Sequence, residues 1–430
     1  MTLMMAQYCR EGLPQLHMGN PLIEALPSIM DGITLKSTLE TRPELDMRSS
    51  KNAPPHVRKY DVDALNELYV PPPCAVSFAQ KIDFLLRNGY VGRSLLNPKE
   101  VQRVYNIQEL VKFQGGIGRT LAGIITLKGT SGMGKSRLTR MILSMLPQVI
   151  QHGSYEGLPF IHTQVVWLSV EAPIGGAMKS FLISLFVAFD EALGYTGTGK
   201  SHADKIRRTD SYPELIRRFV QLAATHSLGI LHIDDIQRIA ETGTDKEHIM
   251  QIMIRLANVA KFGIVFTGTQ SINEVVKPAV GHGIKDKKSG PLGENTLQKE
   301  FEVTRRMISE GFIELKRPTS SDDPFFQSLV ERLLEYQWLD EPLVSSETLI
   351  PFLYDLTAGI PAILILIYKA AQCRALAHGN PKLTPNDLLD AYRRECVPLS
   401  RLINQLRNGR MTGADFDNKF GGVFDASFKT

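Results

Sequence analysis

The chain contains 430 residues, of which 43% are hydrophobic, 8% aromatic and 22% charged. This composition is ordinary for a globular protein with a sizeable core, and the length suggests roughly two to three domains. The 49 basic and 45 acidic residues leave a net charge of only +4, so binding of nucleic acid would depend on local clusters of basic side chains.

The four cysteines lie far apart and form no CxxC pair, which argues against a structural zinc site and favours free thiols in a reducing compartment. No apolar run approaches the about twenty residues that a membrane-spanning helix needs. The N-terminus lacks the basic segment of a signal peptide. We therefore expect a soluble, cytoplasmic protein.

Residues 1–60 contain six prolines, which interrupt any long helix. This pattern predicts an extended arm with short helical pieces, and it fits a disordered tail as well as a partner-docking arm. Residues 61–318 are predicted to form a helical lead-in, with helices over 61–68 and 78–88, followed by an α/β core.

From residue 121 onward, strand patterns alternate with helix patterns, which predicts a parallel sheet flanked by helices. The expected strands cover residues 122–127, 165–170, 229–233, 264–267 and 312–315. The expected helices cover residues 136–145, 178–193, 212–224, 246–260 and 298–308. Residues 275–297 carry several glycines and lysines and are expected to form a long basic loop.

Beyond Pro318 the pattern is entirely helical, with segments expected over 324–336, 347–356, 361–377 and 385–394. Residues 319–395 therefore predict a small helical lid. Residues 396–430 are expected to form a C-terminal tail.

One octapeptide fits the phosphate-binding pattern G-x-x-x-x-G-K-[ST] at every position, between a strand-like and a helix-like segment. It consists of Gly129, Thr130, Ser131, Gly132, Met133, Gly134, Lys135 and Ser136. Its backbone N–H groups would surround the phosphates of ATP, while Lys135 reaches the β- and γ-phosphates and Ser136 offers a hydroxyl to Mg²⁺. A chance glycine-rich turn would lack this flanking context.

The expected strand 229–233 ends in two carboxylates, Asp234 and Asp235. Two acids at the end of a buried strand are costly unless they face a cation. Asp234 would position Mg²⁺, and Asp235 would orient or polarise the attacking water. His232 interrupts the apolar run, and we expect it to be a packed, hydrogen-bonded histidine rather than a ligand.

The strand 264–267 also ends in polar residues, and its end would lie near the γ-phosphate if this strand sits between the first two. Thr269 is therefore the candidate sensor of the γ-phosphate, although a simple strand-capping threonine is the alternative. Arg305 and Arg306 close the expected helix 298–308. Either could act as an arginine finger on a neighbouring subunit's γ-phosphate, or both could be an ordinary surface pair.

These residues, in this order and followed by a helical lid, resemble an AAA+ ATPase. Further strings resemble the TnsC-type regulators of Tns transposons and, more distantly, TniB and MuB. The strings are Asn20-Pro21-Leu22-Ile23, Gly89-Tyr90-Val91-Gly92-Arg93, Gln148-Val149-Ile150-Gln151-His152, Gln164-Val165-Val166-Trp167-Leu168, Asp234-Asp235-Ile236-Gln237 and Thr357-Ala358-Gly359-Ile360-Pro361. Together they extend over most of residues 18–395.

The resemblance implies an ATP-dependent regulator of transposition that forms a ring or filament on duplex DNA. It would receive a signal from a TniQ/TnsD-type target selector through the N-terminal arm, and contact a TnsA/TnsB-type transposase through the C-terminal tail. The lid helix that follows Gly359, Ile360 and Pro361 has no early arginine, so this turn is expected to wall the nucleotide with backbone and apolar groups. By the same analogy, the elements after the second strand would face the DNA. The candidate contacts to the DNA backbone are Lys179, Lys205, Arg207 and Arg208, with a solvated basic loop as the alternative.

One departure from the family pattern concerns Asp235, where Glu is usual. Loss of a methylene withdraws the carboxylate by about 1.5 Å, and misplacement on that scale can cost on the order of a hundredfold in rate. We therefore expect intact ATP binding with slow hydrolysis. Two other readings stay open: another P-loop machine, such as an initiator-like or helicase-loading ATPase, and a nucleotide-gated scaffold with little hydrolysis.

Overall fold

The structure is a computed structural model, and it describes residues 3–107, 123–173, 178–239, 246–272, 311–344, 347–413, 415–417 and 419. The chain divides into two compact units. The α/β unit comprises Met1–Asp31, Ser77–Lys128 and Thr139–Ile313. The lid unit comprises Gly32–Val76, Gly129–Leu138 and Glu314–Thr430. The predicted domain boundaries stay a prediction. Each predicted domain was one continuous stretch, whereas each compact unit combines three separate segments of the chain.

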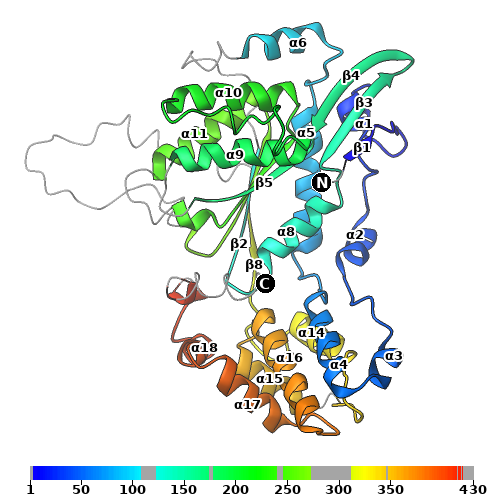
Figure 1. Ribbon diagram of the computed structural model, residues 1–430, viewed down its shortest axis with the longest axis vertical. Helices are drawn as coiled ribbons and strands as arrows, with labels where there is room; N and C mark the ends of the chain where they lie inside the picture. Colours follow the sequence, from blue (N-terminus) through cyan, green and yellow to red (C-terminus); the bar gives the residue numbers. More distant parts are fainter. Residues whose placement is uncertain are drawn as a thin grey trace, which may run out of the picture. The chain divides into compact units, whose positions relative to one another are not determined.

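A five-stranded parallel sheet forms the core of the fold, as the alternating pattern predicted (Figure 1). Its strands are β2 (Ile124–Gly129), β5 (Trp167–Glu171), β6 (Ile230–Asp234), β7 (Gly263–Gly268) and β8 (Phe312–Leu315). Their order in the sheet is β5-β6-β7-β2-β8, so β7 lies between the strand that ends at Asp234 and the strand that leads into the phosphate loop. The expected position of the third strand is thus confirmed.

Three helices of the α/β unit pack together beside this sheet, namely α9 (Met178–Leu193), α10 (Tyr212–Thr225) and α11 (Lys246–Ala260) (Figure 1). Their apolar residues recur at helical spacing, which gives each helix one buried face. In α9 this face includes Phe181, Leu185 and Phe189, all of them fully buried. Two further helices of the described chain, α5 (Ala75–Tyr90) and α6 (Pro98–Tyr105), precede the sheet; α5 contains the predicted helix 78–88.

A second, three-stranded sheet was not predicted. It has the order β1-β3-β4, with β1 (Leu3–Met5) parallel to β3 (Val149–Tyr155) and β3 antiparallel to β4 (Leu158–Val165). The strand expected over 165–170 is β5, but it begins two residues later, at Trp167, because Val165 ends β4. Val165, Val166 and Leu168 are all fully buried, so the apolar pattern continues from β4 into β5.

The lid unit is helical. Its helices are α2 (Gly32–Leu39), α3 (Met47–Asn52), α4 (Pro55–Asp61), α14 (Pro324–Leu334), α15 (Leu349–Thr357), α16 (Pro361–His378), α17 (Pro385–Glu395) and α18 (Ser400–Arg407). The helix expected over 61–68 is instead the end of α4 followed by a 3₁₀ turn, Val62–Asn66. Among the described residues no single helix is long and apolar enough to cross a membrane, although the bent pair α15 and α16 passes that test together.

Residues from the expected N-terminal arm pack directly against the lid helices. The Trp338 indole N–H donates to the Ser50 hydroxyl at 2.8 Å, and the Arg58 guanidinium donates to the Trp338 carbonyl at 2.9 Å. Trp338 is fully buried. This part of the arm is therefore an integral part of a folded unit.

Candidate nucleotide and nucleic-acid sites

The phosphate loop lies where the motif predicted it, between β2 and α8 (Lys135–Ser144). Gly132 and Gly134 have φ values of +79° and +87°, a region that favours glycine. A side chain on Gly129 would also be excluded, because its Cβ would lie 2.7 Å from the Leu315 carbonyl oxygen. The Lys135 ammonium donates to the Thr130 carbonyl at 3.1 Å, so it remains folded against the loop.

The turn that opens the lid helix α16 contacts this loop within the lid unit. The backbone N–H of Ala362, in the first turn of α16, donates to the Gly132 carbonyl at 3.2 Å. Ala358 and Gly359 both have positive φ, at +50° and +74°, which turns the chain sharply between α15 and α16. The location of this turn fits the wall predicted for Gly359, Ile360 and Pro361; their contact with a nucleotide stays a prediction.

Two residues beside the loop were missed by the sequence analysis, Arg137 and Tyr69. The Arg137 guanidinium donates to the carbonyls of Asn66 and Glu67 at 2.7 and 2.6 Å and lies 5.0 Å from the centre of the Tyr69 ring. The Tyr69 hydroxyl is buried and has no hydrogen-bond partner among the described residues. Burial raises the pKa of Tyr69. No motif marks either residue, because their roles arise only from the fold of the lid unit.

In the α/β unit, β6 ends at Asp234, and Asp235 follows with a positive φ of +53°. Each residue is only 6% exposed. The Asp235 carboxylate accepts hydrogen bonds from the Arg238 guanidinium at 2.8 Å and from the Gln237 amide at 3.2 Å. Arg238 also reaches Glu171 at 3.2 Å. The carboxylate expected to orient water is therefore held by two side chains that sequence reasoning did not identify.

The Gln237 side chain connects this carboxylate to the end of β7. Its carbonyl oxygen accepts from the Thr269 backbone N–H at 3.1 Å. Gly268 makes room for it, since a Cβ there would lie 2.5 Å from that oxygen. The Thr269 hydroxyl is buried and lacks a hydrogen-bond partner within the described ranges. An unsatisfied buried hydroxyl is costly, so a ligand oxygen that paired with it would stabilise the site.

His232 behaves as the sequence predicted. Its two ring nitrogens lie 2.8 Å from the Ser169 hydroxyl and 2.5 Å from the Thr267 hydroxyl, and the residue is fully buried. Burial lowers its pKa, although the neighbouring Asp234 opposes that shift. His232 is thus a packed, hydrogen-bonded core histidine.

The residues expected to hold Mg²⁺ are the Ser136 hydroxyl, at the start of α8, and the Asp234 carboxylate. Both are hard oxygen ligands, which suit Mg²⁺ held by one or two side chains, water and substrate phosphates. The described part of the chain contains no cluster of three or more His, Cys, Asp or Glu residues that could form an all-protein cage. The donor chemistry therefore fits Mg²⁺ that arrives with a nucleotide.

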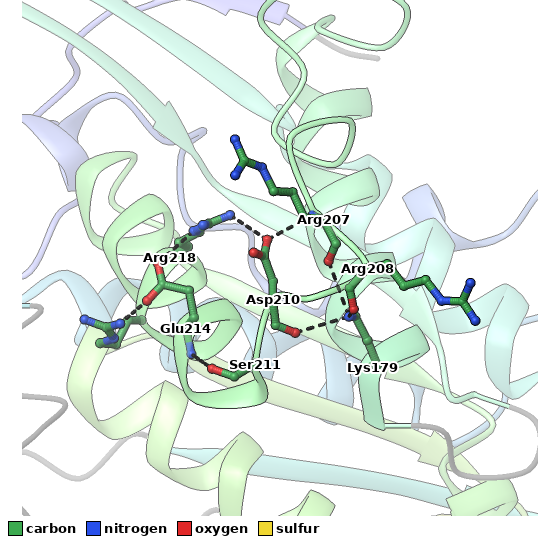
Figure 2. A network of polar contacts seen from close by, with 8 residues as sticks. Lys179, Arg207, Arg208, Asp210, Ser211, Glu214 and Arg218 are labelled. Atoms are coloured by element: carbon green, nitrogen blue, oxygen red, sulfur yellow. Dashed lines mark hydrogen bonds and ion pairs between the residues drawn. The ribbon is translucent and has the colours of Figure 1, made fainter.

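Three of the expected DNA contacts, Lys205, Arg207 and Arg208, lie on the connection between α9 and α10, and the fourth, Lys179, lies in the first turn of α9 (Figure 2). The Lys179 ammonium donates to the carbonyls of Arg208 and Asp210 at 2.7 and 3.1 Å, and to that of Arg207 at 3.4 Å. The Lys179 ammonium therefore holds the backbone of residues 207–210 in place. The side chains of Lys205, Arg207 and Arg208 are exposed, and the two guanidinium groups point away from the network in Figure 2.

The connection is fixed at both ends by carboxylates. The Asp190 carboxylate, buried in α9, accepts from the backbone N–H groups of His202 and Ala203 at 2.8 Å and from the Ser201 hydroxyl at 2.9 Å. Although burial opposes ionisation, these hydrogen bonds lower the pKa of Asp190. Asp210 accepts from the Arg207 N–H at 2.9 Å and from Arg218 at 3.0 Å. We call residues 200–210 the basic loop.

The arginine-finger candidates Arg305 and Arg306 lie outside the described residues. So do the long glycine- and lysine-containing loop expected over 275–297 and the helix expected over 298–308. Those three expectations stay predictions.

Comparison with known proteins gives one family match and a set of similar solved structures. Residues 119–276 match the family described as AAA domain. The Walker-type ATPase PABY2304 of Pyrococcus abyssi is similar with a TM-score of 0.37 and 16% identity, over 73% of this chain and 77% of that one. The Aeropyrum pernix ORC2 protein in its ADP form has a TM-score of 0.40 and 13% identity, over 70% and 68% of the two chains. The Aeropyrum pernix ORC1 protein in complex with DNA has a TM-score of 0.36 and 15% identity, over 70% and 68%. No curated protein matches the sequence significantly.

The protein therefore has the AAA+ P-loop fold, with an AAA domain over residues 119–276. This class implies nucleotide binding, and it indicates ATPase activity.

Proposed function

We propose that this protein is an AAA+ regulator of DNA transposition of the TnsC type. In this proposal it binds ATP and Mg²⁺, assembles on duplex DNA without reading its sequence, and links a TniQ/TnsD-type target selector to a TnsA/TnsB-type transposase. Lys135 and the loop N–H groups would bind the phosphates, and Ser136 and Asp234 would hold the metal. Thr269 would sense the γ-phosphate, and Arg305 or Arg306 would complete a neighbour's site.

The observation that carries this proposal is a buried network joining the strings that resemble TnsC. The Asn20 amide donates to the Tyr90 carbonyl at 2.9 Å, and the Gln164 amide donates to the Leu22 carbonyl at 3.0 Å. His152 lies 2.9 Å from the Gln164 carbonyl oxygen. Four strings that are distant in sequence thus form one built feature of the α/β unit, which supports reading them together rather than as chance matches.

Three further observations support parts of the proposal. The exposed guanidinium groups of Arg207 and Arg208 on a fixed loop suit contact with phosphates. The Tyr69 hydroxyl beside the phosphate loop, which has no partner among the described residues, is a candidate contact for the base or ribose of the nucleotide. The ion pair of Asp235 with Arg238 supports slow hydrolysis, because the carboxylate is not free to orient water.

Electron microscopy of the full-length protein would test this function. We expect rings or filaments on duplex DNA with ATP, and neither without nucleotide. The matched control is Lys135→Ala, which should not assemble under the same conditions. A protein that binds ATP but remains monomeric on DNA would contradict the proposal and favour the initiator-like or helicase-loading alternative. Assemblies that persist equally under ATP and a non-hydrolysable analogue would favour the scaffold reading.

A further inference from the structure

The C-terminal segment places a carboxylate on the phosphate loop. The Asp417 Oδ1 atom accepts from the backbone N–H of Ser131 at 2.7 Å, across 286 positions of sequence. Asp417 is 5% exposed, and its neighbour Phe416 is fully buried. Ser131 and Asp417 both belong to the lid unit.

The turn that carries Asp417 is a built element. The Thr412 hydroxyl and the Asp415 carboxylate are hydrogen-bonded at 2.7 Å, and the Phe416 N–H donates to the Thr412 carbonyl at 3.0 Å. Met411 is also buried, at 8% exposure. The turn is thus stabilised by the burial of Met411 and Phe416 and by the hydrogen bonds of Thr412. It holds the Asp417 carboxylate against the phosphate loop.

The N–H groups of this loop are the donors that cradle nucleotide phosphates. A carboxylate oxygen has the charge and hydrogen-bonding character of a phosphate oxygen, so both would seek the same donor. Two anions cannot share it, because they would repel each other in a partly buried site. Lys135 meanwhile donates to the loop carbonyl of Thr130.

We propose that residues 411–417 are an internal ligand of the phosphate loop, with Asp417 standing in for a phosphate oxygen. Nucleotide binding then displaces this segment and exposes it to partners. The inference rests on the proposed role of the loop in ATP binding. It deepens that proposal by giving the nucleotide state a direct connection to the C-terminal segment.

Nucleotide affinity tests the competition. The full-length protein and its Asp417→Ala variant would be titrated with a fluorescent ADP analogue. We expect the variant to bind about tenfold more tightly, which corresponds to ~1.4 kcal/mol. Asp390→Asn, on the exposed side of α17, is the matched control, because it removes one negative charge from the same unit without altering the turn at 411–417; its affinity should equal that of the wild type. Equal affinities of Asp417→Ala and the wild type would overturn the inference and leave ATP binding intact.

Limited trypsin digestion gives a second test that does not depend on affinity. Cleavage after Arg410 should be slow in the wild type without nucleotide, fast in Asp417→Ala, and accelerated by ATP in the wild type but not in Lys135→Ala. Equal cleavage of the wild type and Asp417→Ala in the absence of nucleotide would refute the docked segment even if the protein bound no ATP. Loss of DNA assembly with these results intact would instead count against the proposed function alone.

Discussion

At the scale of single residues, Asp235 is the position on which the proposal of slow hydrolysis rests. Its carboxylate is shorter than the usual Glu by one methylene, and it is bound by Arg238 and Gln237. Its backbone has a left-handed φ of +53°. The position of the Asp235 carboxylate is therefore set by its hydrogen bonds to Arg238 and Gln237, and not by the needs of an attacking water.

Replacing Asp235 by Glu should therefore accelerate hydrolysis. The longer side chain would extend the carboxylate by about 1.5 Å, and we expect DNA-stimulated turnover to rise by about tenfold to a hundredfold. Steady-state phosphate release measures this change. Turnover equal to that of the wild type would show that side-chain length does not limit the rate.

The Gln237→Ala variant should separate catalysis from binding. It removes the bridge between Asp235 and the Thr269 N–H while leaving the phosphate loop untouched. We expect turnover to fall by about tenfold, a change that corresponds to ~1.4 kcal/mol, because the candidate sensor Thr269 loses the acceptor that holds its N–H. ATP affinity should change little. Gln221→Ala, on the exposed face of α10, is the control. A parallel loss of ATP affinity would show instead that Gln237 supports the fold.

Sequence reasoning identified those site residues that belong to a contiguous motif or end a patterned strand. The phosphate loop and Asp234 are of this kind, and so is Thr269. Gln237 and Arg238 were given no role, although both bond the nearby Asp235, because their second partners, Thr269 and Glu171, are brought near only by tertiary folding. Tyr69 and Arg137 were missed because they meet each other only in the folded chain. The Asp417 contact could not be predicted for the same reason, since no local pattern indicates which distant donor a carboxylate will reach.

At the scale of elements, the basic loop and the neighbouring start of α9 show how fixed and exposed charges differ. Lys179 donates to three carbonyls within the structure, whereas Arg207 and Arg208 are exposed (Figure 2). Both kinds look alike in sequence. The β3–β4 hairpin is a parallel case, because the apolar pattern of β4 runs on into β5 and gives no sign of a second sheet.

Charge reversal on the loop should weaken DNA binding in a salt-dependent manner. For the double variant Arg207→Glu and Arg208→Glu, we expect a marked loss of affinity and a shallower dependence on salt, by about one unit of slope for each lost phosphate contact. Arg393→Glu, on the exposed side of α17, is the control. Anisotropy titrations with duplex DNA at several salt concentrations measure both quantities. An unchanged salt dependence would show that the loop does not contact DNA.

Lys179→Met should lower the free energy of unfolding without changing DNA affinity, because Lys179 donates to backbone carbonyls.

At the scale of the whole molecule, four histidines are buried or half-buried as neutral groups. Burial lowers the pKa of His162 to about 3, and it also lowers the pKa values of His152, His226 and His232. All four belong to the α/β unit. At a pH below their ordinary pKa, these histidines therefore bind protons in the unfolded chain while they stay neutral in the folded chain.

Stability should consequently fall with acidification. Because the folded pKa values lie below the ordinary value of about 6.5, their contribution is complete above that pH and is lost as the pH falls toward the folded pKa values. Each such proton contributes up to ~1.4 kcal/mol per pH unit. Thermal melts at about pH 7.5 and 5.5 should differ, and His162→Gln should reduce the difference. A melting temperature independent of pH over this interval would contradict the expectation.

The lid unit also has a consequence for how this protein can be altered. Its helices include residues 32–76, and Trp338 is hydrogen-bonded to Ser50 and Arg58. A lid transplanted from a relative as residues 314–430 alone would leave that indole without its partners and expose apolar surface. A functional chimera must therefore exchange both stretches together, and shortening the N-terminus past residue 31 should damage the lid before it affects any docking partner.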